Sequence, residues 1–175
     1  MPKAAREGGH EIAAPAQYLD ETRYSSANRR RLSAPGLRAF LAIADLWGLS
    51  EADRLRVLGF PGRSTYHGWV ARARTGQDLV LGVDTLLRIS AVLGIHKALR
   101  ILFETDAEGT GWLREPHDAP TFGGEPPIAL LTAGTQDALM QVRRYLDAMR
   151  GGIFAVPNEA DRDFAPYRDD DIVFV

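Results

Sequence analysis

Apolar side chains recur at intervals of three and four residues through most of the chain between residues 35 and 152. No stretch alternates apolar and polar positions over the length of a strand. The clearest stripe begins after Pro35 and ends at Gly48, and its inward positions are Leu37, Phe40, Leu41, Ala44 and Trp47. The pattern therefore predicts an all-α fold whose first confident helix covers this stretch.

Two short helices joined by a tight turn are predicted next. Ser50 is a good N-cap residue, Asp53 suits the positive end of a helix, and Gly59 ends this helix. After the turn at Pro61-Gly62, Ser64 can cap another helix. Its apolar stripe must face a core and consists of Tyr66, Trp69, Val70 and Ala73. These lengths are typical of a helix-turn-helix, whose second helix enters the major groove of DNA.

The second half of the chain is also predicted to be helical. Asp84 caps a fourth helix that Gly94 closes, and a fifth helix from Ile95 to Phe103 forms a hairpin with it. Trp112-Leu113 indicates a short helical turn.

A Pro/Gly-rich loop at 116–127 leads into a helix at Ile128, and Thr135 caps a last helix that Gly151-Gly152 stops. The buried stripe of that last helix is Leu139, Val142, Leu146 and Met149.

Four segments are expected from these boundaries. They are a flexible basic arm at residues 1–33, a helix-turn-helix domain at 34–81, a small helical domain at 82–152 and an acidic tail at 153–175. The arm has few large apolar side chains to offset the entropy of ordering. Its run Arg29-Arg30-Arg31 could follow phosphates or enter a minor groove, and a solvated segment is the alternative.

Composition narrows the function further. The 175 residues carry a net charge of -2, divided as +4 over residues 1–81 and -6 over residues 82–175. This asymmetry fits a polyanion on one half and a basic protein on the other, although uneven scatter explains it equally well. With no cysteine, no signal peptide and no membrane span in the sequence, a reducing cytoplasm fits best.

The sequence offers little for catalysis, and we expect no enzyme, no metal and no cofactor. His10-Glu11 lacks the second histidine of a zinc protease motif, and Gly109-Thr110-Gly111 lacks the strand and third glycine of a dinucleotide-binding motif. Consecutive acids such as Asp169-Asp170-Asp171 point in different directions, which favours a solvated tail over a magnesium site.

The exposed face of the predicted second helix of the helix-turn-helix suits DNA. Small residues let a helix lie deep in the groove, hydroxyls and the helix N-terminus bind phosphate or base edges, and arginines contact the backbone or guanine. The expected DNA-binding residues are Arg63, Ser64, Thr65, His67, Gly68, Arg72 and Arg74. The alternative is an ordinary helical core with a basic surface.

From about Leu37 to Gly152 the chain resembles the Xre/MbcA/ParS family of antitoxins. The motifs that carry the resemblance lie along both predicted domains in a fixed order. They are Ser64-Thr65 with Trp69, then Asp84-Thr85-Leu86-Leu87-Arg88-Ile89, Ala98-Leu99 with Leu102-Phe103, Trp112-Leu113-Arg114-Glu115-Pro116, Phe122-Gly123-Gly124-Glu125-Pro126-Pro127-Ile128 with Leu130-Leu131, and Val142, Leu146-Asp147 and Gly151-Gly152.

The resemblance implies a component of a type II toxin-antitoxin system. Its helix-turn-helix would bind operator DNA of its own operon, and residues 82–152 would bind and block a RES-domain toxin that consumes NAD or ADP-ribosylates a target. It also implies a homodimer and a toxin-antitoxin hetero-oligomer.

A toxin that binds NAD must hold two phosphates, so an acidic and partly apolar element is a suitable plug for its pocket. We expect the tail, the loop after Thr121 and the last helix to cover the toxin. The expected toxin-binding residues are Phe122, Gly123, Gly124, Glu125, Arg143, Arg144, Asp169, Asp170, Asp171, Ile172 and Phe174. A core role for Phe122 and a solvated role for the two arginines are the alternatives.

Two other functions remain open from the sequence. The chain could be a stand-alone repressor whose second half dimerises or senses a ligand. It could also be an enzyme of an unrecognised class, although no cluster of ionisable residues in the sequence supports this.

Overall fold

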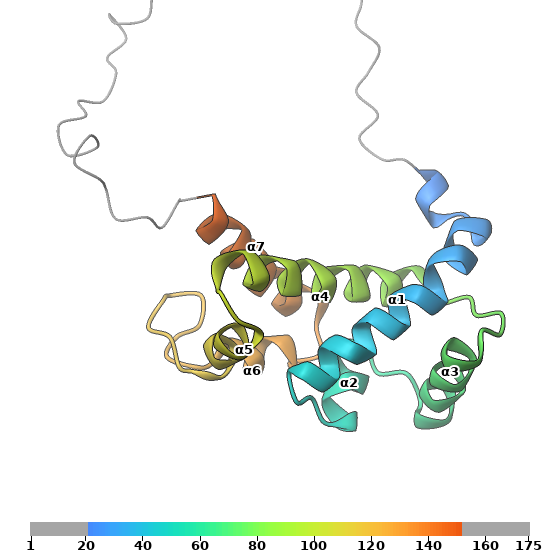
Figure 1. The fold of residues 1–175 in the computed structure, drawn as a ribbon, viewed down its shortest axis with the longest axis horizontal. Coiled ribbons are helices and arrows are strands. Elements are labelled where there is room, and N and C mark those ends of the chain that lie inside the picture. The colour runs from blue at the N-terminus through green and yellow to red at the C-terminus, as the bar shows by residue number, and fades with distance from the viewer. Residues whose placement is uncertain (1–20, 152–175) are drawn as a thin grey trace, which may run out of the picture.

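Helix α4, Val83–Leu102, is the central element of the computed structural model, which describes residues 21–151. It packs against α1, Ser26–Leu46, on one side and against α7, Gln136–Arg150, on another. Figure 1 shows these three long helices with the shorter α-helices below them. Between residues 21 and 151 all regular structure is helical and no strand occurs, which confirms the all-α prediction.

The remaining helices complete the two halves. The short 3-10 helix η1, Glu21–Tyr24, precedes α1, and α2, Glu51–Val57, and α3, Arg63–Thr75, follow it. After α4 come α5, Asp106–Arg114, and α6, Pro127–Leu131. Contacts of α1 with α3 and of α6 with α7 close the core on both sides of α4.

Two of the local capping signals were predicted correctly. Ser50 accepts a hydrogen bond from the Asp53 backbone N–H at 3.2 Å, and the Asp53 carboxylate accepts one from the Ser50 backbone N–H at the same distance. Thr135 caps α7 in a similar way through the Ala138 N–H. A cap satisfies a backbone donor at a helix start, so these residues fix where α2 and α7 begin.

The first helix begins earlier than the sequence predicts. Residues 26–33, expected in a flexible arm, form the first two turns of α1, and Pro35 lies inside the helix. Ser33 is fully buried, and its hydroxyl donates to the Arg29 carbonyl at 2.6 Å and accepts from the Leu81 N–H at 2.8 Å. This contact with a residue 48 positions away stabilises turns that the local pattern does not explain.

The predicted hairpin of two helices around Gly94 is also wrong, because α4 is continuous from Val83 to Leu102. Gly94 serves packing instead of ending a helix. A Cβ atom there would lie 2.6 Å from Cζ of Arg143, so the missing side chain makes room for the guanidinium of α7. A smaller correction concerns α3, which begins at Arg63 with Gly62 as its N-cap, so Ser64 does not cap it.

Candidate nucleic-acid and partner interfaces

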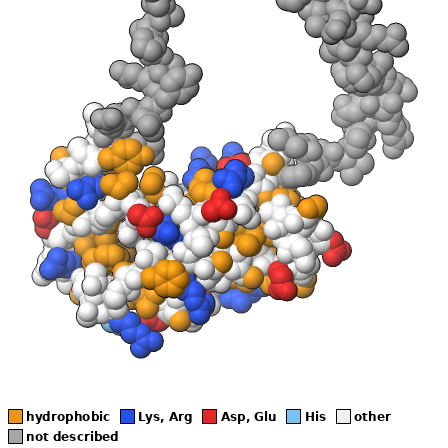
Figure 2. All heavy atoms as spheres, turned by 180° about the vertical axis from the view of Figure 1, so that it is seen from behind, with side chains coloured by type: hydrophobic (Ala, Val, Ile, Leu, Met, Phe, Trp, Pro, Cys, Tyr) orange, Lys and Arg blue, Asp and Glu red, His pale blue; other side chains and the backbone are white. Residues whose placement is uncertain are grey.

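The seven residues predicted to bind DNA all lie on the exposed surface of α3. Its buried face consists of Tyr66 and Ala73, which are 4% and 1% exposed, while Trp69 and Val70 are half-buried. The exposed residues are Arg63, Ser64, Thr65, His67, Gly68, Arg72 and Arg74. Seen from behind, Lys and Arg side chains gather along the lower edge, at the end of the molecule that carries α2 and α3 (Figure 2).

An acidic side chain lies beside this basic surface and was missed by the sequence analysis. The Glu51 carboxylate, in the first turn of α2, lies 3.6 Å from Nε of Arg63 and 3.5 Å from Nε2 of His67. Glu51 and Arg63 lie on different helices, and no local pattern joins them. The carboxylate would compete with a phosphate for these two side chains.

The run of three arginines lies on α1 instead of in an extended arm. The Arg29 Nη1 atom donates to the Leu81 carbonyl at 3.2 Å, and Nε of Arg30 pairs with Asp78 at 3.0 Å. Arg38, further along α1, donates to the Ala73 carbonyl near the end of α3 at 2.9 Å. The basic residues of α1 therefore hold α3 and the segment after it against the bundle.

The turn between α2 and α3 rests on the second half of the chain. Phe60 adopts a φ of 59°, and its ring lies so close to Gly134 that a Cβ atom there would be 2.5 Å from the ring Cζ. Arg88 of α4 is 9% exposed and donates to the Gly134 carbonyl at 2.9 Å and to Asp84 at 2.8 Å. We call Gly59, Phe60, Asp84, Arg88 and Gly134 the interdomain junction.

An aromatic cluster fills the second half beneath the predicted toxin-binding loop. Trp112 stacks on Tyr145 at 6.1 Å between ring centroids and meets Phe122 edge-on at 5.8 Å. A ring nitrogen of His117 lies 2.8 Å from the Trp112 carbonyl, and the two ring centroids are 4.8 Å apart. Phe122 is 5% exposed, so its side chain has the core role that the sequence left open as an alternative.

The exposed part of the loop consists of Gly123, Gly124 and Glu125. Both glycines have positive φ, 59° and 87°, in a tight turn whose Gly124 N–H donates to the His117 carbonyl at 3.0 Å. A left-handed backbone favours glycine, which explains the two glycines in this turn.

The two arginines of α7 that were predicted to bind the toxin make contacts within the chain. Nη1 of Arg143 donates to the Ser90 carbonyl at 3.3 Å, and Arg144 pairs with Asp137 at 3.3 Å. Hydrogen bonds from Gln141 and then Arg144 hold the pKa of Asp137 below its usual value. The five tail residues predicted to bind toxin, Asp169, Asp170, Asp171, Ile172 and Phe174, lie outside the described residues.

The described part of the chain holds no group of three or more His, Asp and Glu side chains placed to bind a metal ion. None of the helices between residues 21 and 151 is both long and apolar enough to span a membrane. What the geometry offers is a basic exposed helix at one end and an exposed glycine turn over an aromatic cluster at the other.

Comparison with known families matches each half separately. Residues 26–94 match the antitoxin Xre-like helix-turn-helix domain, and residues 98–152 match the antitoxin Xre/MbcA/ParS C-terminal toxin-binding domain. The chain is also 42% identical over 116 residues to the uncharacterized protein y4oB of Sinorhizobium fredii, strain NBRC 101917 / NGR234. That similarity covers 66% of this chain and 84% of the relative.

Proposed function

The chain belongs to the Xre/MbcA/ParS family of antitoxins, and from this premise we propose that it neutralises a RES-domain toxin and represses its own operon. The observation that supports both activities is that the two sets of candidate residues lie on different elements of the structure. The DNA-binding candidates lie on α3, and those toxin-binding candidates that fall within residues 21–151 lie on the loop after Thr121 and on α7. One molecule can therefore hold DNA and toxin together.

The proposal for DNA rests on the shape and charge of α3. Ser64, Gly68 and Ala71 are small and exposed, so the helix axis can approach the floor of the major groove. Arg63 and Arg72 are both exposed, and nine residues apart on a helix they flank this small-residue face on opposite sides, where guanidinium groups suit phosphates or guanine. We propose that a homodimer of the chain binds two half-sites in its operator, because dimeric helix-turn-helix proteins read such sites.

A salt titration of operator binding tests this assignment. Removal of one arginine that binds a phosphate should reduce the slope of log K against log salt by about 0.9. Arg63→Ala and Arg72→Ala are expected to lower both affinity and slope. Arg144→Ala removes the same charge from an exposed position on α7 and serves as the matched control. If the two α3 variants bind like the control, α3 is not the recognition helix.

The proposal for the toxin rests on the second half and on the tail. A RES-domain toxin that binds NAD needs positively charged side chains around the two phosphates of NAD. The acidic residues 169–171 would pair with these positive charges, and Ile172 and Phe174 would enter apolar subsites of the same pocket. The exposed turn at 123–125 would cover the mouth of that pocket. We propose that the toxin is blocked by occlusion, and that toxin and antitoxin form a hetero-oligomer.

Purification of the tagged chain from its native host, followed by mass spectrometry after a high-salt wash, identifies the partner. A stoichiometric RES-domain protein is the expected result. Recovery of a homodimer that binds only DNA would instead favour a stand-alone repressor, the second function that the sequence leaves open.

Deletion of residues 169–175 then tests the tail with the purified toxin. The inhibition constant is expected to rise, and Glu125→Ala should weaken inhibition as well if the loop covers the pocket. A replacement of residues 2–8 by a Gly/Ser sequence of the same length is the control. An unchanged inhibition constant on tail deletion would reject the role of the tail and leave the domain-level proposal in place.

A further inference from the structure

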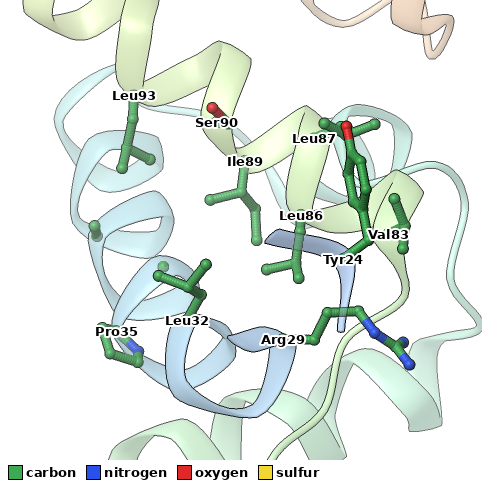
Figure 3. Close-up of a pocket in the computed structure, with 12 residues that line it drawn as sticks. Tyr24, Arg29, Leu32, Pro35, Val83, Leu86, Leu87, Ile89, Ser90 and Leu93 are labelled. Atoms are coloured by element: carbon green, nitrogen blue, oxygen red, sulfur yellow. The ribbon is translucent and has the colours of Figure 1, made fainter. Parts of the chain in front are cut away.

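An open apolar hollow of about 460 Å³ lies between the first half of α1 and α4. Leu32 from α1 and Leu86, Ile89 and Leu93 from α4 point into the same space (Figure 3). Leu32 is 42% exposed, among the largest exposures of an apolar side chain in the described part of the chain. The size and lining are typical of sites that accept apolar groups.

The rim of the hollow carries a charged group with an unused donor. Arg29 lines the hollow with its aliphatic stem and donates from Nη1 to the Leu81 carbonyl. Its Nε atom is buried and has no hydrogen-bond partner among the described residues. A buried donor without a partner costs about 1–3 kcal/mol, so an acceptor at this rim would stabilise whatever fills the hollow.

We propose that residues 12–19 of this same chain fill the hollow and cover the α1/α4 face. The segment reads Ile-Ala-Ala-Pro-Ala-Gln-Tyr-Leu, with a single polar side chain, Gln17, apart from the Tyr18 hydroxyl. Residues 1–11 by contrast carry five charged or histidine side chains, Lys3, Arg6, Glu7, His10 and Glu11. The apolar character is thus concentrated in residues 12–19, which lie nearer in the sequence than residues 1–11 to the first lining residue, Tyr24.

The described part of the chain begins at the hollow itself. Tyr24, the last residue of η1, is one of the lining residues, and η1 contacts α1. Only residues 20–23 separate Leu19 from Tyr24, a span of at most about 18 Å when extended. Asp20 follows the apolar segment directly, and its carboxylate is the acceptor that we assign to Nε of Arg29.

Two other occupants of the hollow, the residues after α7 and a second copy of the chain, are less favoured. The last helix, α7, ends at the side of the bundle opposite to η1, as Figure 1 shows, so the residues that follow it start far from the hollow. A second copy would have to compete with a segment tethered within a few residues, whose effective concentration is in the mM range. The tether therefore favours residues 12–19 at any ordinary protein concentration.

Disulfide trapping tests this inference, which concerns the chain alone and does not depend on the antitoxin function. The chain has no cysteine, so one engineered pair gives an unambiguous signal. Ser90 is exposed and lines the hollow, and Ala14 lies in the middle of the segment. In the full-length variant A14C/S90C, we expect an intramolecular disulfide whose rate of formation does not depend on protein concentration.

The pair A14C/A107C is the matched control, because Ala107 is exposed on α5 beyond the other end of α4. The Ser90 pair should form at least about ten times faster than this control, since docking raises the local concentration. Replacing Ile12, Tyr18 and Leu19 together by Ser should reduce the rate at Ser90 to that of the control.

Two outcomes would overturn the inference. Equal rates for the Ser90 and Ala107 pairs would show that the segment does not dock in the hollow. Disulfide-linked dimers of A14C/S90C or of S90C alone, with a yield that rises with protein concentration, would show that a second copy covers the face instead.

Discussion

Glu51 is the residue that most directly opposes the proposed binding of DNA. Its carboxylate repels phosphate and holds Arg63 and His67 at 3.6 and 3.5 Å. Because exposed ion pairs contribute about 0–1 kcal/mol, we expect Glu51→Gln to tighten operator binding by up to about fivefold. Fluorescence anisotropy with labelled operator DNA measures this change.

Glu115→Gln, an exposed position at the end of α5, removes the same charge away from α3 and is the control for Glu51→Gln. A similar gain in both variants would assign the effect to net charge. Weaker binding by Glu51→Gln would mean that the carboxylate positions Arg63 for DNA.

His96 links the stability of the fold to pH. The imidazole lies in α4 with its centroid 6.3 Å from the Trp47 ring, and burial, followed by opposing effects of Asp106 and Arg100, lowers its pKa below 6.5. The unfolded chain therefore binds the proton more readily than the folded chain. The free energy of unfolding should fall as the pH drops below about 6.5 and recover above it.

His96→Asn is expected to reduce this dependence, so that the stability of the natural chain relative to the variant increases between pH 5 and pH 7. Urea unfolding at several pH values measures it. If the His96→Asn variant keeps the full dependence, other groups cause it.

At the scale of elements, the interdomain junction joins the turn before α3 to the start of α7. Gly134 has a φ of 91°, and a Cβ atom there would also meet the Phe60 ring at 2.5 Å. Gly134→Ala should therefore lower the free energy of unfolding by about 1–2 kcal/mol because of the strained backbone, and by a further amount because of the clash with the ring. Urea unfolding gives the total.

Gly124→Ala separates the two contributions. Gly124 has a similar φ of 87°, but apart from its chain neighbours no atom of the described residues lies within 4 Å of the added Cβ, so only the backbone cost applies. We also expect Phe60→Ala to reduce the cost of Gly134→Ala, because it removes the ring. If Gly134→Ala and Gly124→Ala lowered the free energy of unfolding equally, this would contradict a close contact between Gly134 and the Phe60 ring.

The elements that the sequence predicted well are those whose signals are local. Ser50 and Thr135 cap their helices through residues three positions away, and the spacing of Tyr66 and Ala73 defines the buried face of α3. The failures have distant causes. The early start of α1 depends on Leu81, and the continuity of α4 through Gly94 depends on Arg143.

The same limit applies to the candidate sites. The exposed surface of α3 follows from helical periodicity, whereas Glu51 reaches it only through the folded turn between α2 and α3. Phe122 lies in a loop, a contact role was expected for it with a core role as the alternative, and its burial depends on Trp112 and Tyr145, which come from helices α5 and α7. The sequence shows that a large aromatic side chain is present at position 122, but not whether that side chain faces the core or the surface.

At the scale of the whole molecule, α4 belongs to both halves. The helix-turn-helix match ends at residue 94 and the toxin-binding match begins at residue 98, so the boundary between them lies within one continuous helix. The first half packs on α4 through α1 and the second through α7. We therefore expect the two halves to unfold in one transition.

Variants with a single tryptophan measure this. Trp69 on α3 reports on the first half when Trp47 and Trp112 are replaced by Phe, and Trp112 on α5 reports on the second when Trp47 and Trp69 are replaced. Circular dichroism of each variant provides the reference for the whole chain. The two fluorescence midpoints in urea should coincide, and clearly separate midpoints would mean that α4 does not couple the halves.

A helix shared by two halves also fixes the orientation of one half relative to the other. Since α4 passes from one half to the other without a linker, a toxin held at the second half would take a set direction around the axis of a DNA duplex held at α3. Operator half-sites about 10.5 base pairs apart would place two toxins on the same side of the duplex, and an added half turn would place them on opposite sides. The spacing of the operator would then decide whether neighbouring complexes can touch.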